Sequence, residues 1–189
     1  MVSKVGVLAL QGNYSQHQAV LDQIGVANCL VLYPDDLDSC DLLIIPGGES
    51  TAISKQIHRN NFRPKLAEFV KKKPVFGTCA GMILLSSSNK KNLEELSVMD
   101  FDLDRNAYGA QINSFSDNIL LNFDKDKKFH GFFIRAPKVS RIGSNVEVIA
   151  TFKNEPVMLT DGMHYVTSFH PEIGNDYRIH EYIIKNSNA

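Results

Sequence analysis

The sequence has few cysteines, almost no net charge and no long apolar run, and each absence excludes a class of protein. Three irregularly spaced cysteines make a poor disulfide framework, which favours free thiols and a cytoplasmic location. The 20 basic and 21 acidic residues nearly cancel, so we expect neither nucleic acid nor an anionic membrane as a partner. No apolar run approaches the ~18 residues of a membrane span, and the N-terminus lacks a signal-peptide pattern.

What remains is typical of a globular protein. Apolar residues make up 43% of the 189-residue chain and charged residues 22%, so disorder is not expected. We find no internal repeat and no linker rich in proline or glycine. The sequence therefore predicts a single domain over residues 1–189.

The first half alternates apolar runs of strand length with helical patterns, which is typical of a parallel sheet covered on both faces. The second half carries shorter strand patterns and a terminal helix at 177–185, with 124–128 as a surface turn. We predict an α/β protein with three αβα layers and a mostly parallel open sheet that antiparallel strands extend. The predicted strands are 5–10, 28–33, 42–45, 75–76, 99–103, 119–123, 132–134, 146–152, 157–160 and 165–169.

The sharpest chemical signal is the segment GTCAG at residues 77–81, between a buried strand and a helical pattern. A G-x-C-x-G sequence there has the form of a nucleophile elbow with cysteine in place of serine. The turn sets Cys79 at a helix N-terminus, where the helix dipole favours the thiolate, and aims the Ala80 amide at a developing oxyanion. A buried packing cysteine is the alternative, but it does not require the paired glycines. Cys29 and Cys40 fit that role, because they lie in or beside strand patterns.

A thiol nucleophile needs a base, and His170 is the best placed of the six histidines. His170 and Glu172 follow an apolar strand at a spacing that puts both side chains on one face of extended backbone. Such a carboxylate can fix the tautomer of the imidazole. His17 is interpreted as a half-buried helical residue. No histidine shows metal-ligand spacing, so we expect no metal.

Residues 46–51, PGGEST, also join a strand pattern to a helical one. Gly47 and Gly48 permit a close approach of backbone to a ligand and offer a second oxyanion donor. From this segment alone, a turn followed by a helix cap is the simpler interpretation. A phosphate-binding loop is excluded because its lysine and glycine pattern is absent.

Taken together, PGGEST, GTCAG and FHPE resemble the class I, triad-type glutamine amidotransferase family. Residues 6–12, 105–109 and 133–137 narrow the resemblance to the glutaminase subunits of pyridoxal 5′-phosphate synthases. That resemblance runs almost end to end and implies the flavodoxin-like fold of this family. It also implies hydrolysis of glutamine to glutamate and ammonia, no cofactor in the glutaminase, and a hetero-oligomer with a synthase (lyase) subunit that uses the ammonia to make vitamin B6.

The resemblance also implies roles for individual residues. It makes Cys79 the nucleophile, His170 the acid and base, and Glu172 its orienting carboxylate. The remaining residues that it implies are the oxyanion donors Gly48 and Ala80 and the glutamine-binding residues Gly47, Gly48, Glu49, Arg105, Ile134 and Arg135. An arginine suits this task because a guanidinium pairs with the α-carboxylate of a free amino acid.

Three positions depart from the family pattern: Ala110 precedes Gln111, Gln16 replaces an acidic residue, and a glycine is absent near residues 164–165. None belongs to the expected triad. Two other interpretations remain. One is a different class I glutaminase or γ-glutamyl hydrolase with another partner, and the other is an interaction subunit that has lost catalysis. The intact Cys79, His170 and Glu172 argue against the second.

Overall fold

A computed structural model of the chain describes residues 2–87, 96–105 and 114–187. Across these ranges nine strands form one sheet in the order β2-β1-β3-β4-β11-β10-β9-β6-β7, and β5 pairs with β8 in a second sheet. The strands are β1 (Val5–Leu8), β2 (Asn28–Val31), β3 (Leu42–Ile45), β4 (Val75–Thr78), β5 (Phe101–Asp104), β6 (Ser114–Leu121), β7 (Asp124–Ile134), β8 (Lys138–Ile142), β9 (Glu147–Phe152), β10 (Glu155–Thr160) and β11 (Tyr165–Thr167).

The strands of the large sheet pair in parallel on one side and antiparallel on the other. From β2 to β11 every neighbouring pair is parallel, whereas β10, β9, β6 and β7 each pair antiparallel. The parallel strands β1, β3 and β4 are buried along their whole length, as expected for strands covered on both faces. The predicted parallel sheet with an antiparallel extension is therefore confirmed.

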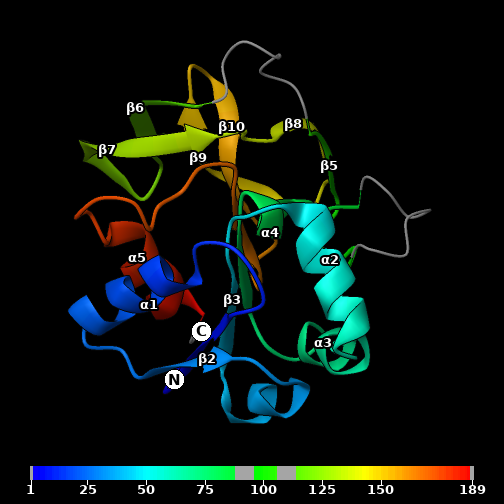
Figure 1. Ribbon diagram of the computed structural model, residues 1–189. Coiled ribbons are helices and arrows are strands. Elements are labelled where there is room, and N and C mark those ends of the chain that lie inside the picture. The colour runs from blue at the N-terminus through cyan, green and yellow to red at the C-terminus, as the bar shows by residue number, and fades with distance from the viewer. Residues whose placement is uncertain (1, 88–95, 106–113, 188–189) are drawn as a thin grey trace.

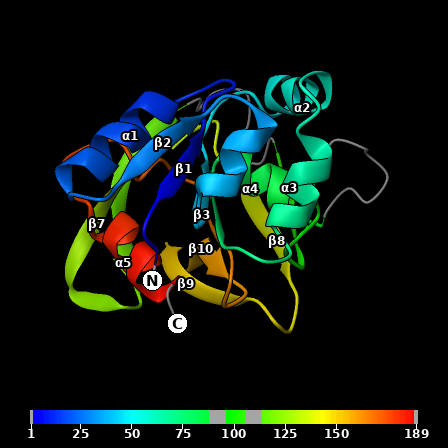
Figure 2. The ribbon, with the colours of Figure 1, turned by 90° about the horizontal axis from the view of Figure 1, so that it is seen from below.

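Helices cover both faces of the sheet. Helices α1 (Tyr14–Gln23) and α5 (Arg178–Asn186) pack on one face, and α2 (Ser50–Arg59), α3 (Arg63–Phe69) and α4 (Ala80–Leu85) pack on the other (Figures 1 and 2). Each face has its own apolar core, with Leu21 and Ile179 in one and Ile53 and Leu66 in the other. A short 3-10 helix, Pro34–Ser39, follows β2. The three predicted layers are therefore present.

One local prediction is wrong. Residues 124–128 were expected to form a surface turn, but they begin the long strand β7. The turn lies just before them, at residues 122–123. The pairs Leu121–Asp124 and Ile119–Phe129 hold the two ends of this segment against β6, and residues 125–128 lie in a register irregularity between them. Strand β8 and the 3-10 helix were not predicted.

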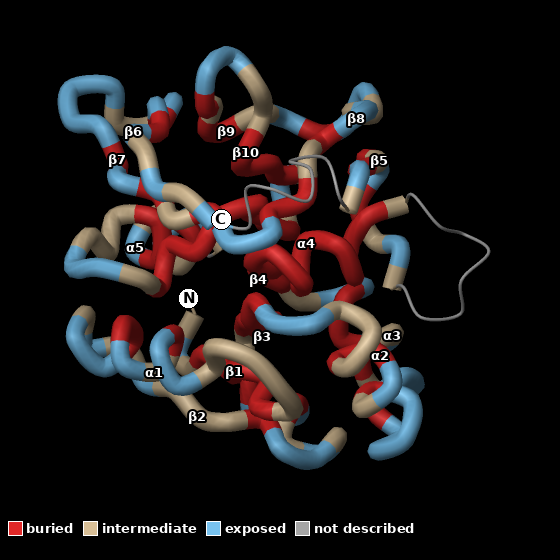
Figure 3. The backbone as a smooth tube through the Cα atoms, turned by 45° about the horizontal axis from the view of Figure 1, so that its top comes forward, coloured by how far each residue is buried: buried red, intermediate tan, exposed pale blue. Residues whose placement is uncertain are grey.

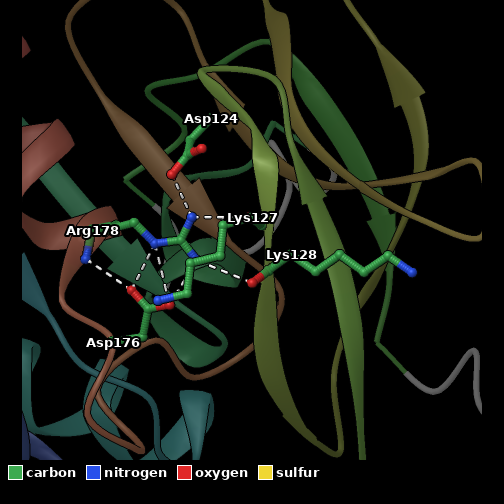
Figure 4. A network of polar contacts seen from close by, with 5 residues as sticks. All are labelled: Asp124, Lys127, Lys128, Asp176 and Arg178. Atoms are coloured by element: carbon green, nitrogen blue, oxygen red, sulfur yellow. Dashed lines mark hydrogen bonds and ion pairs between the residues drawn. The ribbon is translucent and has the colours of Figure 1, made fainter.

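The β6–β7 hairpin is tied to the start of α5 by a polar cluster around Arg178 (Figure 4). The guanidinium of Arg178 forms ion pairs with Asp124 of β7 and with Asp176, and it donates to the carbonyl oxygens of Lys127 and Lys128. Arg178 and Asp124 are 54 residues apart in the chain, so this cluster joins two distant segments. It therefore fixes the loop after β11 against the antiparallel half of the sheet.

Burial is greatest at the centre of the molecule, in β1, β3, β4 and α4 (Figure 3). Within the described ranges, no helix is both long enough and apolar enough to cross a membrane. The carboxyl ends of β4 and β11 are adjacent because these strands are parallel neighbours, with Thr78 paired to Thr167. Open α/β sheets usually bind ligands at such an edge, which makes this edge the place to look for a functional site.

Candidate active site

Cys79 stands at a sharp turn between β4 and α4, as the GTCAG segment predicts. Its φ of 46° and ψ of −94° are strained for a residue with a side chain, and strain of this kind is typical of functional sites. A Cβ on Gly77 would lie 2.6 Å from the carbonyl carbon of Gly81, and one on Gly81 would lie 2.2 Å from the Ile45 oxygen. Both flanking positions therefore require glycine, and the nucleophile elbow is present.

His170 and Glu172 come from the loop that follows β11. The backbone amide of Cys79 donates to the Thr167 oxygen at 2.8 Å, so the pairing of β4 with β11 continues as far as Cys79. The Cys79 side chain is close enough to His170 to raise the pKa of its imidazole. On its other side, His170 Nδ1 lies 2.7 Å from Glu172 Oε1. The structure therefore brings together the three side chains that the sequence predicted as a triad.

All three side chains are nearly inaccessible to solvent, with 4–5% of each residue exposed. Burial by itself would lower the pKa of His170, but the hydrogen bonds and negative charges of Cys79 and Glu172 raise it to about 10. Burial raises the pKa of Glu172, yet the nearby His17 and the hydrogen bond from His170 outweigh this and bring it to about 2. At neutral pH the site therefore holds an imidazolium against a carboxylate.

The loop between β3 and α2 packs directly on this imidazole. A Cβ on Gly47 would lie 2.3 Å from His170 Cε1, so only glycine fits there. The Gly47 carbonyl accepts a hydrogen bond from the Asn13 amide at 3.0 Å. Because the carbonyl and the following N–H of a trans peptide point in opposite directions, the Gly48 amide is directed away from Asn13.

The other residues predicted to bind glutamine differ in how close they lie to Cys79 and His170. Ile134 ends β7, and its carbonyl oxygen lies 3.6 Å from Cys79 Sγ. Arg135 is exposed beside it, with a left-handed φ of 46°. The Glu49 carboxylate caps α2 by accepting from the Thr51 and Ala52 amides. Arg105 is half-buried at the end of β5, and its role in binding glutamine stays a prediction.

Two of the three positions that depart from the family pattern lie within the described residues. Gln16 is exposed on α1, away from the buried face of that helix, and residues 164–165 begin β11 at the end opposite His170. Ala110 and Gln111 lie outside the described residues. Among those that are described, no group of three or more His, Cys, Asp and Glu side chains is placed to hold a metal ion.

The sequence did not reveal two polar contacts of the triad carboxylate. Asn13 Nδ2 donates to Glu172 Oε1 at 3.3 Å, and His17 Nε2 lies 3.5 Å from Glu172 Oε2. His17 was expected to be half-buried, but it is fully buried. Its position four residues into a helix with an apolar face gave a signal for burial. Nothing local in the sequence indicated that the chain's other end would supply its partner.

Comparisons with known proteins agree with this geometry. The family model described as the SNO glutamine amidotransferase family matches residues 7–189. Relatives from Francisella tularensis subsp. tularensis (strain WY96-3418) and subsp. novicida (strain U112), both named pyridoxal 5′-phosphate synthase subunit PdxT, are 44% identical over 184 residues, or 97% of this chain and 99% of theirs. A solved glutamine amidotransferase structure, 35% identical, superimposes with a TM-score of 0.90 and covers 98% of this chain and 99% of that one.

Proposed function

This chain belongs to the SNO glutamine amidotransferase family, and we propose that it hydrolyses L-glutamine to L-glutamate and ammonia as the glutaminase subunit of a pyridoxal 5′-phosphate synthase. The observation that carries the chemistry is the convergence of two features: the strained turn that presents Cys79, and the pair formed by His170 and Glu172, whose Nδ1 and Oε1 lie 2.7 Å apart after the neighbouring strand β11. The relatives that are 44% identical carry the name of such a subunit and are matched along almost their whole length. These two facts, one chemical and one evolutionary, support the same function.

The reaction begins with attack of the Cys79 thiolate on the side-chain carboxamide carbon of glutamine. We assign the amides of Gly48 and Ala80 to the oxyanion, because both belong to turns that flank the nucleophile and His170. The imidazolium of His170 then gives its proton to the departing nitrogen, which leaves as ammonia while a γ-glutamyl thioester remains on Cys79. Loss of that proton leaves His170 neutral and ready to act as a base.

The second half of the cycle restores the enzyme. Neutral His170 takes a proton from water, and the oxygen attacks the thioester carbon. Collapse of the intermediate breaks the carbon–sulfur bond, releases glutamate and returns the Cys79 thiolate beside the protonated His170. Glu172 holds Nδ1 of His170 throughout, so the opposite ring nitrogen faces the sulfur.

Substrate recognition is assigned to residues that border this centre. We propose that Arg105 pairs with the α-carboxylate of glutamine and that Ile134 and Arg135 close the pocket from the end of β7. Glu49 contributes by capping α2, which fixes the loop of Gly47 and Gly48 beneath the substrate. The Ile134 side chain is 39% exposed although it is apolar, which suits a segment that a partner or substrate covers.

We propose a cytoplasmic hetero-oligomer in which a synthase subunit docks over the carboxyl edge of the sheet and receives the ammonia. A glutaminase without its partner would lose ammonia to solvent, so we expect low activity until docking. The three free cysteines fit a reducing compartment. The test is ammonia release from glutamine, measured with and without a candidate synthase subunit. Equal turnover in both mixtures would refute the coupling, and no turnover by the complex would refute the assigned function.

A further inference from the structure

Two buried histidines outside the triad form a pair beneath it. His17 lies on α1 and His180 on α5, and both are at most 1% exposed. His17 Nδ1 lies 3.0 Å from His180 Nε2, across 163 residues of sequence. Two adjacent buried imidazoles lose the hydration of four ring nitrogens, so a pair of this kind needs a compensating interaction. The glutaminase reaction proposed above does not use either residue.

The second nitrogen of His17 points to the triad. His17 Nε2 lies 3.2 Å from Thr78 Oγ1, immediately before the nucleophile in sequence, and 3.5 Å from Glu172 Oε2. The two oxygens of Glu172 are held unequally. Oε1 contacts His170 and Asn13, whereas Oε2 accepts no hydrogen bond from any residue that the structure describes. His17 therefore faces the carboxylate oxygen that lacks another partner.

Charge and tautomer follow from this geometry. Burial lowers the pKa of His17 against the opposing effect of Glu172, and burial lowers the pKa of His180 to about 3. Both rings are therefore neutral at pH 7, and each carries one N–H. The groups facing this pair are Glu172, His170 and Thr78, of which only the first two titrate.

Only one tautomer assignment suits all of these contacts. With a proton on Nδ1 of His17, the lone pair of Nε2 would face the Glu172 carboxylate, and Nδ1–H of His180 would be buried without an acceptor. With protons on Nε2 of both rings, His180 donates to His17, and the His17 N–H is directed at Thr78 and Glu172. The second arrangement leaves only an acceptor, Nδ1 of His180, unpaired.

We propose that His17 is a positioning residue for the reaction, holding Glu172 through its Nε2–H while His180 fixes the tautomer of His17. This inference rests on the triad assigned under the proposed function. It extends the chain of polar groups from Cys79 through His170 and Glu172 to both terminal helices. Because the carboxylate orients His170, the predicted effect of losing His17 falls on the chemical step and not on glutamine binding.

Two substitutions that differ by one methylene test this role. In His17→Gln the side-chain amide reaches the position of Nε2, whereas in His17→Asn it reaches only that of Nδ1. We expect kcat for ammonia release by the complex with the synthase subunit to fall about tenfold in His17→Asn, with KM changed by less than about twofold, and to recover to within about threefold in His17→Gln. Equal kcat values in the two variants would overturn the proposal.

A matched control separates positioning from general loss of stability. His164 is also buried, at 3% exposure, and accepts a hydrogen bond from the Val75 amide at the end of β11 remote from His170. We expect His164→Asn to lower the unfolding temperature but to leave kcat within about twofold of wild type. A His164→Asn variant whose kcat falls as much as that of His17→Asn would mean that both act through stability alone.

The wild-type protein supplies a second readout that does not depend on any variant folding. Imidazole ¹⁵N spectra at pH 7 are expected to show His17 and His180 as neutral rings protonated on Nε2. A charged ring, or a proton on Nδ1 of His17, would overturn the proposal. Cys79→Ala is measured in parallel. If it stays active, the proposed triad fails, whereas an inactive Cys79→Ala with an unaffected His17→Asn refutes the role of His17 alone.

Discussion

Gly47→Ala tests how closely the loop between β3 and α2 is fitted to the base. The added Cβ would lie 2.3 Å from His170 Cε1 and 3.0 Å from Nδ1, whereas ordinary van der Waals contact begins at 3.4 Å. Either the imidazole or the loop must therefore move by about 1 Å. His170 is held by Glu172 and by a hydrogen bond from its amide to the Phe132 oxygen, so movement of the ring strains both contacts. A misplacement of about 1 Å costs on the order of 10²-fold in rate.

The assay is ammonia release from glutamine by the complex with the synthase subunit, with kcat and KM determined separately. Gly162→Ala is the control because its added Cβ meets no atom within 4 Å, while its φ of +90° still imposes backbone strain. We expect Gly47→Ala to lose about 10²-fold in kcat and Gly162→Ala to lose stability without loss of kcat. A Gly47→Ala enzyme with wild-type kcat would refute the close packing of this loop on His170.

Three further predictions concern the same region. Glu172→Gln removes a charge that raises the pKa of His170, so the alkaline limb of the pH–rate profile moves from near pH 10 toward neutral pH; an unmoved limb would exclude Glu172 as the partner of His170. Gly12→Ala places a Cβ 1.9 Å from the Gly47 oxygen and so displaces the Gly48 amide, which should lower kcat about 10²- to 10³-fold. An unchanged kcat in steady-state kinetics would contradict the role of that amide. Arg178→Met should lower the unfolding temperature measured by calorimetry, because it removes the ion pair between α5 and Asp124 of β7 and a local ion pair with Asp176; an unchanged temperature would show that this cluster is not stabilising.

The elbow was predictable because its requirement is local. A nucleophile between a strand and a helix needs glycine on both sides, and Gly77 and Gly81 stand at the two positions where a Cβ would collide with backbone. His170 was predictable for a related reason. It follows a strand whose parallel neighbour ends immediately before Cys79, and parallel neighbours bring their carboxyl ends together.

What the sequence could not predict depends on contacts between distant segments. The burial of His17 against Glu172 requires α1 and α5 to pack side by side on one face of the sheet, and no local pattern specifies that pairing. The error at 124–128 has a different cause. Alternating Asp and Lys side chains are compatible with a turn or with an exposed strand, and pairing with β6 on both sides of the segment, at Asp124 and at Phe129, selects the strand.

In the proposed reaction Cys79 forms a γ-glutamyl thioester, with His170 as its acid and base. The most direct measurement is intact-protein mass spectrometry of the complex, quenched with acid during turnover of glutamine. We expect the chain to gain the mass of one γ-glutamyl group, located on the peptide that contains Cys79, and to gain none in Cys79→Ala, which should release no ammonia. Ammonia release by Cys79→Ala at the wild-type rate would contradict the claim.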